Sequence, residues 1–263
     1  MKGMSIGQFI PGNSIIHRID SRMKIVCLIF LFIAVISTTS IYGYGLVLLT
    51  IATIVKLSCI PLKVALSLIC KLWVFFIVIF LMNAFFYDAD QPIFSWWLIN
   101  LSHGGIRQGF RVVLNVSFIM VLGTVLTSTT APIEMTNALE WLLKPLKLLR
   151  IPVEDVAMII NVSIQFIPTL IDEAEMIRKA QTARGARFES KKLREKALSY
   201  LPLLIPLFLA SFRRADELSV AMEARGYRNA KNRTKKTRTP LSTHDFTALT
   251  SIAVISIFKI FII

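Results

Sequence analysis

Long apolar runs alternate with short polar segments along the chain, and their lengths predict a helical membrane protein. A run of roughly 17 or more mostly apolar residues is long enough to cross a bilayer as an α-helix. Five runs meet that length, at about 23–41, 42–59, 64–87, 112–130 and 246–263. The pattern therefore predicts an all-α, polytopic fold with about five transmembrane helices.

Basic residues are concentrated between the fourth and fifth predicted spans. Residues 131–240 hold 20 of the 30 Lys and Arg residues and 12 of the 16 Asp and Glu residues. An excess of positive charge retains a segment in the cytoplasm. Arg18, Arg22 and Lys24 precede the first span and favour the same side for the N-terminus, and we expect Lys24 to snorkel towards the headgroups. Five spans then place the C-terminus outside.

This topology divides the chain into four parts. They are a cytoplasmic N-terminal segment at 1–22, four transmembrane helices at 23–130, cytoplasmic or inner-face helices at 131–240 and a last transmembrane helix at 241–263. The pieces 156–170 and 197–212 are apolar enough to be mistaken for spans, but crossing by both would move the basic segment between them outside. We expect them to be long helices along the inner membrane face, kinked or broken at Pro168, Pro202 and Pro206. A short apolar piece around Trp96 and Trp97 is too brief to span and is typical of the interface.

Composition places the chain in the membrane class and excludes several chemistries. Hydrophobic residues make up 55% of it and the net charge is +14, which in a membrane protein indicates cytoplasmic loops and lipid contact before nucleic acid. The three cysteines and three histidines are scattered, so no disulfide frame, metal site or cofactor is expected. A Gly-x-x-x-x-Gly-Lys-Ser/Thr phosphate loop and a catalytic triad are absent from the sequence. No acid stands inside the spans, which argues against a proton-coupled carrier.

An internal repeat with an offset of 41 residues marks the basic region. Its two copies end alike, at Ala183-Arg184-Gly185 and at Ala224-Arg225-Gly226. Further matches are Ala174/Ala215, Ala180/Ala221 and Arg187/Arg228, with Glu175/Asp216 and Ile177/Leu218 conservatively replaced. The repeat predicts two equivalent helical units.

Each unit predicts a helix tip that presents a guanidinium group. Residues at helical spacing form one stripe, which is Ala174, Ile177, Gln181 and Arg184 in the first copy and Ala215, Leu218, Met222 and Arg225 in the second. Gly185 and Gly226 supply the left-handed residue that closes a helix, and a cation suits the negative end of the helix dipole. Such a tip suits a groove with carboxylates at its floor. One copy alone is better explained as the end of a surface helix, but two copies favour paired docking sites for two equivalent partners or a two-fold partner.

The chain resembles the T component (EcfT), the transmembrane scaffold of energy-coupling factor (ECF) transporters, which are ABC-type uptake systems for vitamins and metals. The two Ala-Arg-Gly motifs carry the resemblance together with the N-terminal run 7–24, Phe166-Ile167-Pro168-Thr169-Leu170 and Phe212-Arg213-Arg214-Ala215-Asp216-Glu217-Leu218. Ser21 departs from the family, which commonly has proline there. His17 and Asp20 are expected to cap or staple this entry segment, without chemistry.

The resemblance implies a non-catalytic coupling subunit of an ATP-driven vitamin importer in the cell membrane. Ala183, Arg184, Gly185, Ala224, Arg225 and Gly226 would dock into two cytoplasmic ABC ATPases, with Arg187 and Arg228 as candidate additional contacts. ATP and magnesium would bind to those partners. A membrane-embedded S component would bind the substrate, and a shared scaffold would serve several S components.

Two other classes stay open from the residues alone. One is an integral membrane enzyme, for which Asp172, Glu173 and Glu175 are the nearest acids, although they alternate with cations as on an ordinary solvated helix face. The other is a self-sufficient channel or carrier.

Overall fold

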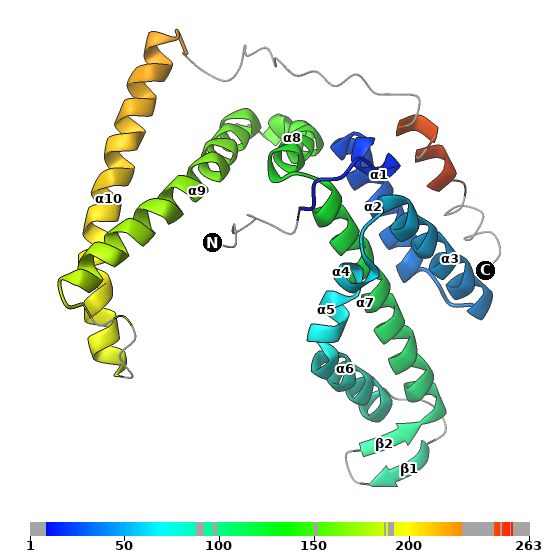
Figure 1. Ribbon diagram of the computed structural model, residues 1–263. Helices are drawn as coiled ribbons and strands as arrows, with labels where there is room; N and C mark the ends of the chain where they lie inside the picture. Colours follow the sequence, from blue (N-terminus) through cyan, green and yellow to red (C-terminus); the bar gives the residue numbers. More distant parts are fainter. Residues whose placement is uncertain are drawn as a thin grey trace. The chain divides into compact units, whose positions relative to one another are not determined.

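A computed structural model describes residues 9–87, 92–96, 99–149, 152–186, 188, 192–227, 245–247, 249–252 and 254 (Figure 1). Its elements, in chain order, are α1 (Ile15–Arg18), α2 (Ser21–Ile36), α3 (Ile41–Ser58), α4 (Leu62–Ala65), α5 (Ser67–Lys71), α6 (Trp73–Phe86), β1 (Pro92–Trp96), β2 (Ile99–Ser102), α7 (His103–Thr129), α8 (Pro132–Leu143), the 3-10 helix η1 (Lys144–Leu149), α9 (Val153–Ala183) and α10 (Leu193–Ala224). The chain forms two compact units, Met1–Ala138 with Thr239–Ile263, and Leu139–Arg238. The all-α class predicted from the sequence is confirmed.

A short β hairpin is the one departure from helix among these elements. Strands β1 and β2 pair antiparallel, with Phe94 opposite Leu101 and Trp96 opposite Ile99. The sequence marked this piece as apolar and too short to span, without predicting its secondary structure. A hairpin satisfies backbone groups within the segment, which an extended apolar piece near a membrane requires.

Within the part of the chain that the structure describes, three helices are long and apolar enough to cross a membrane by length and composition, namely α3, α7 and α9. Helices α2 and α6 are apolar but shorter, with 16 and 14 residues. The last predicted span, 246–263, lies mostly outside the described residues. Helix α9 has a mean hydropathy of 1.3 in its most apolar window against 1.9 for α7. Its location along the inner face therefore stays a prediction.

The span predicted at 64–87 is divided into three helices in the structure, and its crossing of the membrane stays a prediction. The chain there forms α4, α5 and α6, which are separated at Leu66 and Leu72. At these two residues ψ moves to −5° and 20°, away from the α-helical value, although the Leu66 and Leu72 carbonyls still accept from the Cys70 and Phe76 amides at 3.0 and 3.1 Å.

Helices α2, α3 and α7 pack around the core of the first unit. The largest part of this core is aliphatic and comes from these helices: Leu31, Val35, Val47, Ile51, Val55, Phe118, Val121, Leu122 and Val125. Many apolar side chains of α6 point outward instead, for example Trp73 with 62% and Phe86 with 61% of the residue exposed. Such a surface suits contact with lipid.

The N-terminal segment is tied to the end of α7. The Ile10 amide donates to the carbonyl of Ser128 at 3.0 Å, and the Lys24 ammonium donates to the carbonyl of Thr129 at 3.0 Å. Lys24 is only 7% exposed, so the prediction that it snorkels is wrong. Its charge instead meets the carbonyl end of α7, where the helix dipole is negative. Asp20 caps α2 by accepting from the Arg22 amide at 2.9 Å, which confirms its predicted capping role.

Candidate docking site at the ends of two paired helices

Helices α9 and α10 form an antiparallel pair within the second unit (Figure 1). At the turn between them, the rings of Phe188 and Tyr200 lie 5.5 Å apart. At the other end, the hydroxyl of Tyr227, just beyond α10, donates to the sulfur of Met158 near the start of α9 at 2.9 Å. Because the helices run antiparallel, their two C-terminal tips lie at opposite ends of the pair.

Both helices are continuous, so the expectation of a break at the prolines is not met. Helix α9 runs through Pro168, and α10 runs through Pro202 and Pro206. A proline removes one backbone hydrogen bond, and the bonds of the neighbouring turns suffice to carry a helix of 31 or 32 residues past it.

The tip of α9 is closed by a Schellman motif. The Gly185 amide donates to the carbonyl of Thr182 at 3.0 Å, and the Ala186 amide donates to the carbonyl of Gln181 at 3.0 Å. Gly185 has a φ of +90°, a conformation that side chains with a Cβ disfavour. The predicted left-handed glycine is present, and it leaves Arg184 as the capping residue.

The tip of α10 is closed in the same way. The Gly226 amide donates to the carbonyl of Glu223 at 2.8 Å, and the Tyr227 amide donates to the carbonyl of Met222 at 3.0 Å. Gly226 has a φ of +75°. Arg225 caps this helix with φ −85° and ψ 5°, against −85° and 6° at Arg184. The repeat in the sequence is therefore a repeat of backbone geometry.

The six residues of the two Ala-Arg-Gly motifs are all exposed. They are Ala183, Arg184, Gly185, Ala224, Arg225 and Gly226. The residues one to three turns earlier on the predicted stripe are half-buried in the first copy, at Ala174, Ile177 and Gln181, and at Leu218 and Met222 in the second. Ala215, at the base of the second stripe, is exposed. Each stripe is thus partly packed before its tip and presents its arginine at the free end. Arg187 and Arg228 lie outside the described residues.

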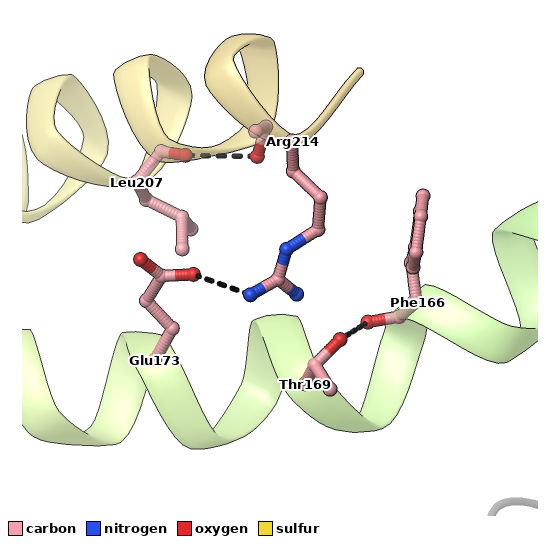
Figure 2. Close-up of polar contacts among 6 residues, drawn as sticks. Phe166, Thr169, Glu173, Leu207 and Arg214 are labelled. Carbon is pink, nitrogen blue, oxygen red and sulfur yellow. Dashed lines mark hydrogen bonds and ion pairs between the residues drawn. The ribbon is translucent and has the colours of Figure 1, made fainter. Parts of the chain in front are cut away.

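An ion pair joins the two helices about two-thirds of the way along each, and sequence reasoning missed it. A terminal nitrogen of Arg214, Nη2, lies 3.7 Å from Glu173 Oε2, and the guanidinium carbon lies 5.8 Å from the centre of the Phe166 ring (Figure 2). Glu173 had been read as ordinary surface charge. Its Oε2 atom is buried and accepts no hydrogen bond from the residues described. A signal was available, because Glu173 and Arg214 occupy equivalent positions of the 41-residue repeat with opposite charge.

The neighbouring acid behaves as the sequence predicted. Glu175 pairs with Lys179 one turn on at 3.0 Å, and both side chains are well exposed. Such an exposed ion pair contributes little to the stability of the fold and indicates a solvated helix face. Among the described residues, no group of three His, Cys, Asp or Glu side chains is placed to hold a metal ion.

One face of α10 is apolar and uncovered over three turns. Its exposed residues are Leu201, Leu204, Ile205, Phe208, Leu209 and Phe212. The rings of Phe208 and Phe212 pack edge to face with their centroids 4.9 Å apart. A contiguous apolar face of this kind needs a cover, either lipid or protein.

Comparison with known proteins gives a consistent result over nearly the whole chain. Residues 12–236 match the family model CbiQ, described as cobalt transport protein. The chain is 40% identical over 237 residues to the energy-coupling factor transporter transmembrane protein EcfT of Ruminiclostridium cellulolyticum, covering 89% of this chain and 88% of the relative. It is 35% identical over 263 residues to EcfT of Bacillus subtilis, covering 100% and 99%. EcfT of Acidaminococcus fermentans is 36% identical over 255 residues, covering 97% and 94%.

Proposed function

The chain belongs to the EcfT family, the transmembrane components of ECF transporters, and we propose that it couples two cytoplasmic ABC ATPases to a substrate-binding S component through α9 and α10. Two identical, exposed, arginine-bearing helix tips carry this proposal. Each tip docks into one ATPase, and ATP-driven closure of the ATPase pair moves both tips. ATP and magnesium belong to the ATPases, so this chain receives work and performs no catalysis.

The geometry of the tips supports two separate but equivalent partners. Arg184 and Arg225 each cap a helix in a Schellman motif with the same backbone angles, and both residues are exposed. They lie at opposite ends of the pair. Each arginine stands 11 residues from the contact between the helices, so the tips are on the order of 33 Å apart at a helical rise of 1.5 Å per residue. A single small groove does not reach both, whereas a two-fold pair of ATPases offers the same groove twice. Arg187 and Arg228 add a second cation to each contact.

The apolar face of α10 supports a membrane-embedded partner. Its six exposed residues form a stripe about 17 Å long at helical rise. An apolar helix of a membrane-embedded protein matches this stripe better than the polar surface of a water-soluble protein does. We assign this face to the S component. Because substrate recognition then resides on another chain, one scaffold serves several S components for vitamins. The N-terminus is cytoplasmic and the C-terminus outside in this arrangement.

The test is co-purification of the ATPases with the Arg184→Ala/Arg225→Ala double variant. If each guanidinium is buried against a carboxylate of its groove, truncation costs on the order of 2 to 5 kcal/mol per tip, and the complex should not survive washing. The matched control is Lys179→Ala/Arg213→Ala, which removes one exposed cation from each of the same helices and should leave assembly intact. Undiminished assembly of the double variant would refute docking by the tips.

A further inference from the structure

The ion pair between Glu173 and Arg214 occupies a special place in the repeat. The offset of 41 residues that superposes the two Ala-Arg-Gly motifs also superposes Glu173 on Arg214. Equivalent positions of two related segments touch each other only at the two-fold axis that relates the segments. The contact at 3.7 Å therefore marks the centre of the α9–α10 pair.

The charges at this centre are opposite, although the repeat is otherwise similar on both sides. The first copy has Asp172-Glu173 where the second has Arg213-Arg214, while the following alanine is retained as Ala174 and Ala215. If both copies had kept the same charge, like charges would face each other across the axis. The divergence converts that repulsion into an attraction between the two copies.

The surroundings of the pair strengthen it without locking its geometry. Arg214 also lies over the ring of Phe166 (Figure 2), and a cation above an aromatic ring is attracted over a range of positions. At 3.7 Å the ionic contact to Glu173 is longer than a hydrogen bond. Coulomb attraction falls only as the inverse of distance, so the pair holds the helices together while their mutual tilt changes.

The pair is also equidistant from the two tips. Glu173 stands 11 residues before Arg184, and Arg214 stands 11 residues before Arg225. Both spacings amount to about 16 Å of helix. The stretch of helix between the ion pair and the tip therefore has the same length in α9 and in α10.

We propose that Glu173 and Arg214 are positioning residues that link α9 and α10 at their common centre, so that movement of the two tips is transmitted to the halves of the helices beyond it. The proposal rests on the proposed function, because the ATPases supply the movement. Because each helix is continuous, loss of the link does not detach a tip from its own helix. It removes the shared pivot, so the helices slide past each other and the movement of the tips no longer sets the separation of the far halves.

The experiment follows two distances with spin labels in the purified complex with its ATPases, in a background without the native cysteines. One pair, Lys179→Cys with Val220→Cys, lies between the centre and the tips, and the other, Ser163→Cys with Leu204→Cys, lies beyond the centre. Each pair joins equivalent, exposed positions of the repeat. In the parent, trapping with ATP and vanadate should shift both distances by several ångströms.

The Arg214→Glu variant places two carboxylates at the centre and should keep the shift near the tips while losing the shift beyond the centre. The double reversal Glu173→Arg/Arg214→Glu restores opposite charges and should restore the second shift. The control Glu175→Arg changes the charge at an exposed position of the same helix and should alter neither distance. ATPase co-purification and ATP hydrolysis should persist in all of these variants.

The outcomes separate the two proposals. A far shift that survives in Arg214→Glu, or that the double reversal does not restore, would overturn the linking role of the pair. Absence of any shift near the tips in the parent would instead show that the ATPases do not move them, and the proposed function would fail. A gentler variant, Glu173→Gln, gives the same test if Arg214→Glu does not fold, and it should reduce the far shift at least twofold.

Discussion

The glycines of the two tips allow a sharp test of how the arginines are presented. Gly185→Ala and Gly226→Ala each add a Cβ to a residue with positive φ, at +90° and +75°. The added atom would meet nothing within 4 Å at either position. Any cost therefore comes from the backbone conformation alone.

The magnitude follows from the left-handed conformation, which costs an L residue roughly 1 to 2 kcal/mol. The favourable left-handed region extends to a φ of about +70°, so Gly226 lies just beyond it and Gly185 lies clearly outside. We expect about 1 kcal/mol at Gly226 and about 2 kcal/mol at Gly185. These values correspond to roughly fivefold and thirtyfold increases in opening of the cap.

The assay is amide hydrogen exchange at the residue after each glycine, because that amide closes the Schellman motif. Exchange at Ala186 should accelerate in Gly185→Ala, and exchange at Tyr227 should accelerate less in Gly226→Ala. Gly185→Asn should recover part of the protection, since Asn tolerates the left-handed region. Affinity for the ATPases should fall more in Gly185→Ala than in Gly226→Ala, because the cap at Gly185 opens more.

The control lies on α7. Gly123 is inside a helix, and an added Cβ there also meets nothing within 4 Å. Gly123→Ala should stabilise the protein by about 0.4 to 1 kcal/mol, because alanine loses less backbone freedom on folding. Equal exchange rates in Gly185→Ala and the parent would refute the account of the tip as a strained glycine cap.

Three further predictions concern the rest of the chain. Gly105→Ala should destabilise the packing of α6 on α7 by about 1 to 3 kcal/mol in thermal unfolding in detergent, because the new Cβ would lie 2.7 Å from a backbone oxygen, whereas Gly123→Ala should not. Lys24→Met should lower the thermal midpoint by removing a charge-assisted hydrogen bond to Thr129, with about 1.5 to 3 kcal/mol at stake, and an unchanged midpoint would contradict that role. Phe208→Asp should abolish co-purification of the S component while both ATPases stay bound; loss of the ATPases as well would show that the apolar face is not a separate surface.

The features that the sequence predicted correctly are local. A helix that ends in Arg-Gly is closed by bonds within six residues, so the repeat was enough to predict the left-handed conformation of Gly185 and Gly226. The cap at Asp20 likewise involves a neighbour two residues away. The all-α membrane class also follows from local information. An apolar segment can form all its backbone hydrogen bonds within itself inside a bilayer only as a helix.

The features that were missed depend on contacts distant in sequence. Lys24 looked like a snorkelling residue because its burial depends on Thr129, 105 residues away. The interruption at Leu66 and Leu72 was invisible because neither residue is a helix breaker. The docking role of the tips, the domain boundaries and the sides of the two termini remain predictions.

The proposed function accounts for where the two copies of the repeat agree and where they differ. At Arg184 and Arg225, where each copy is proposed to face a partner, the residues and the backbone angles agree between the copies. Where the copies face each other, at Glu173 and Arg214, they differ in charge. Binding to two equivalent partners favours identical residues at the outer ends of the two helices. Packing of the helices against each other favours opposite charges where they meet. The two Ala-Arg-Gly motifs and the central ion pair therefore occupy equivalent positions of the same 41-residue repeat.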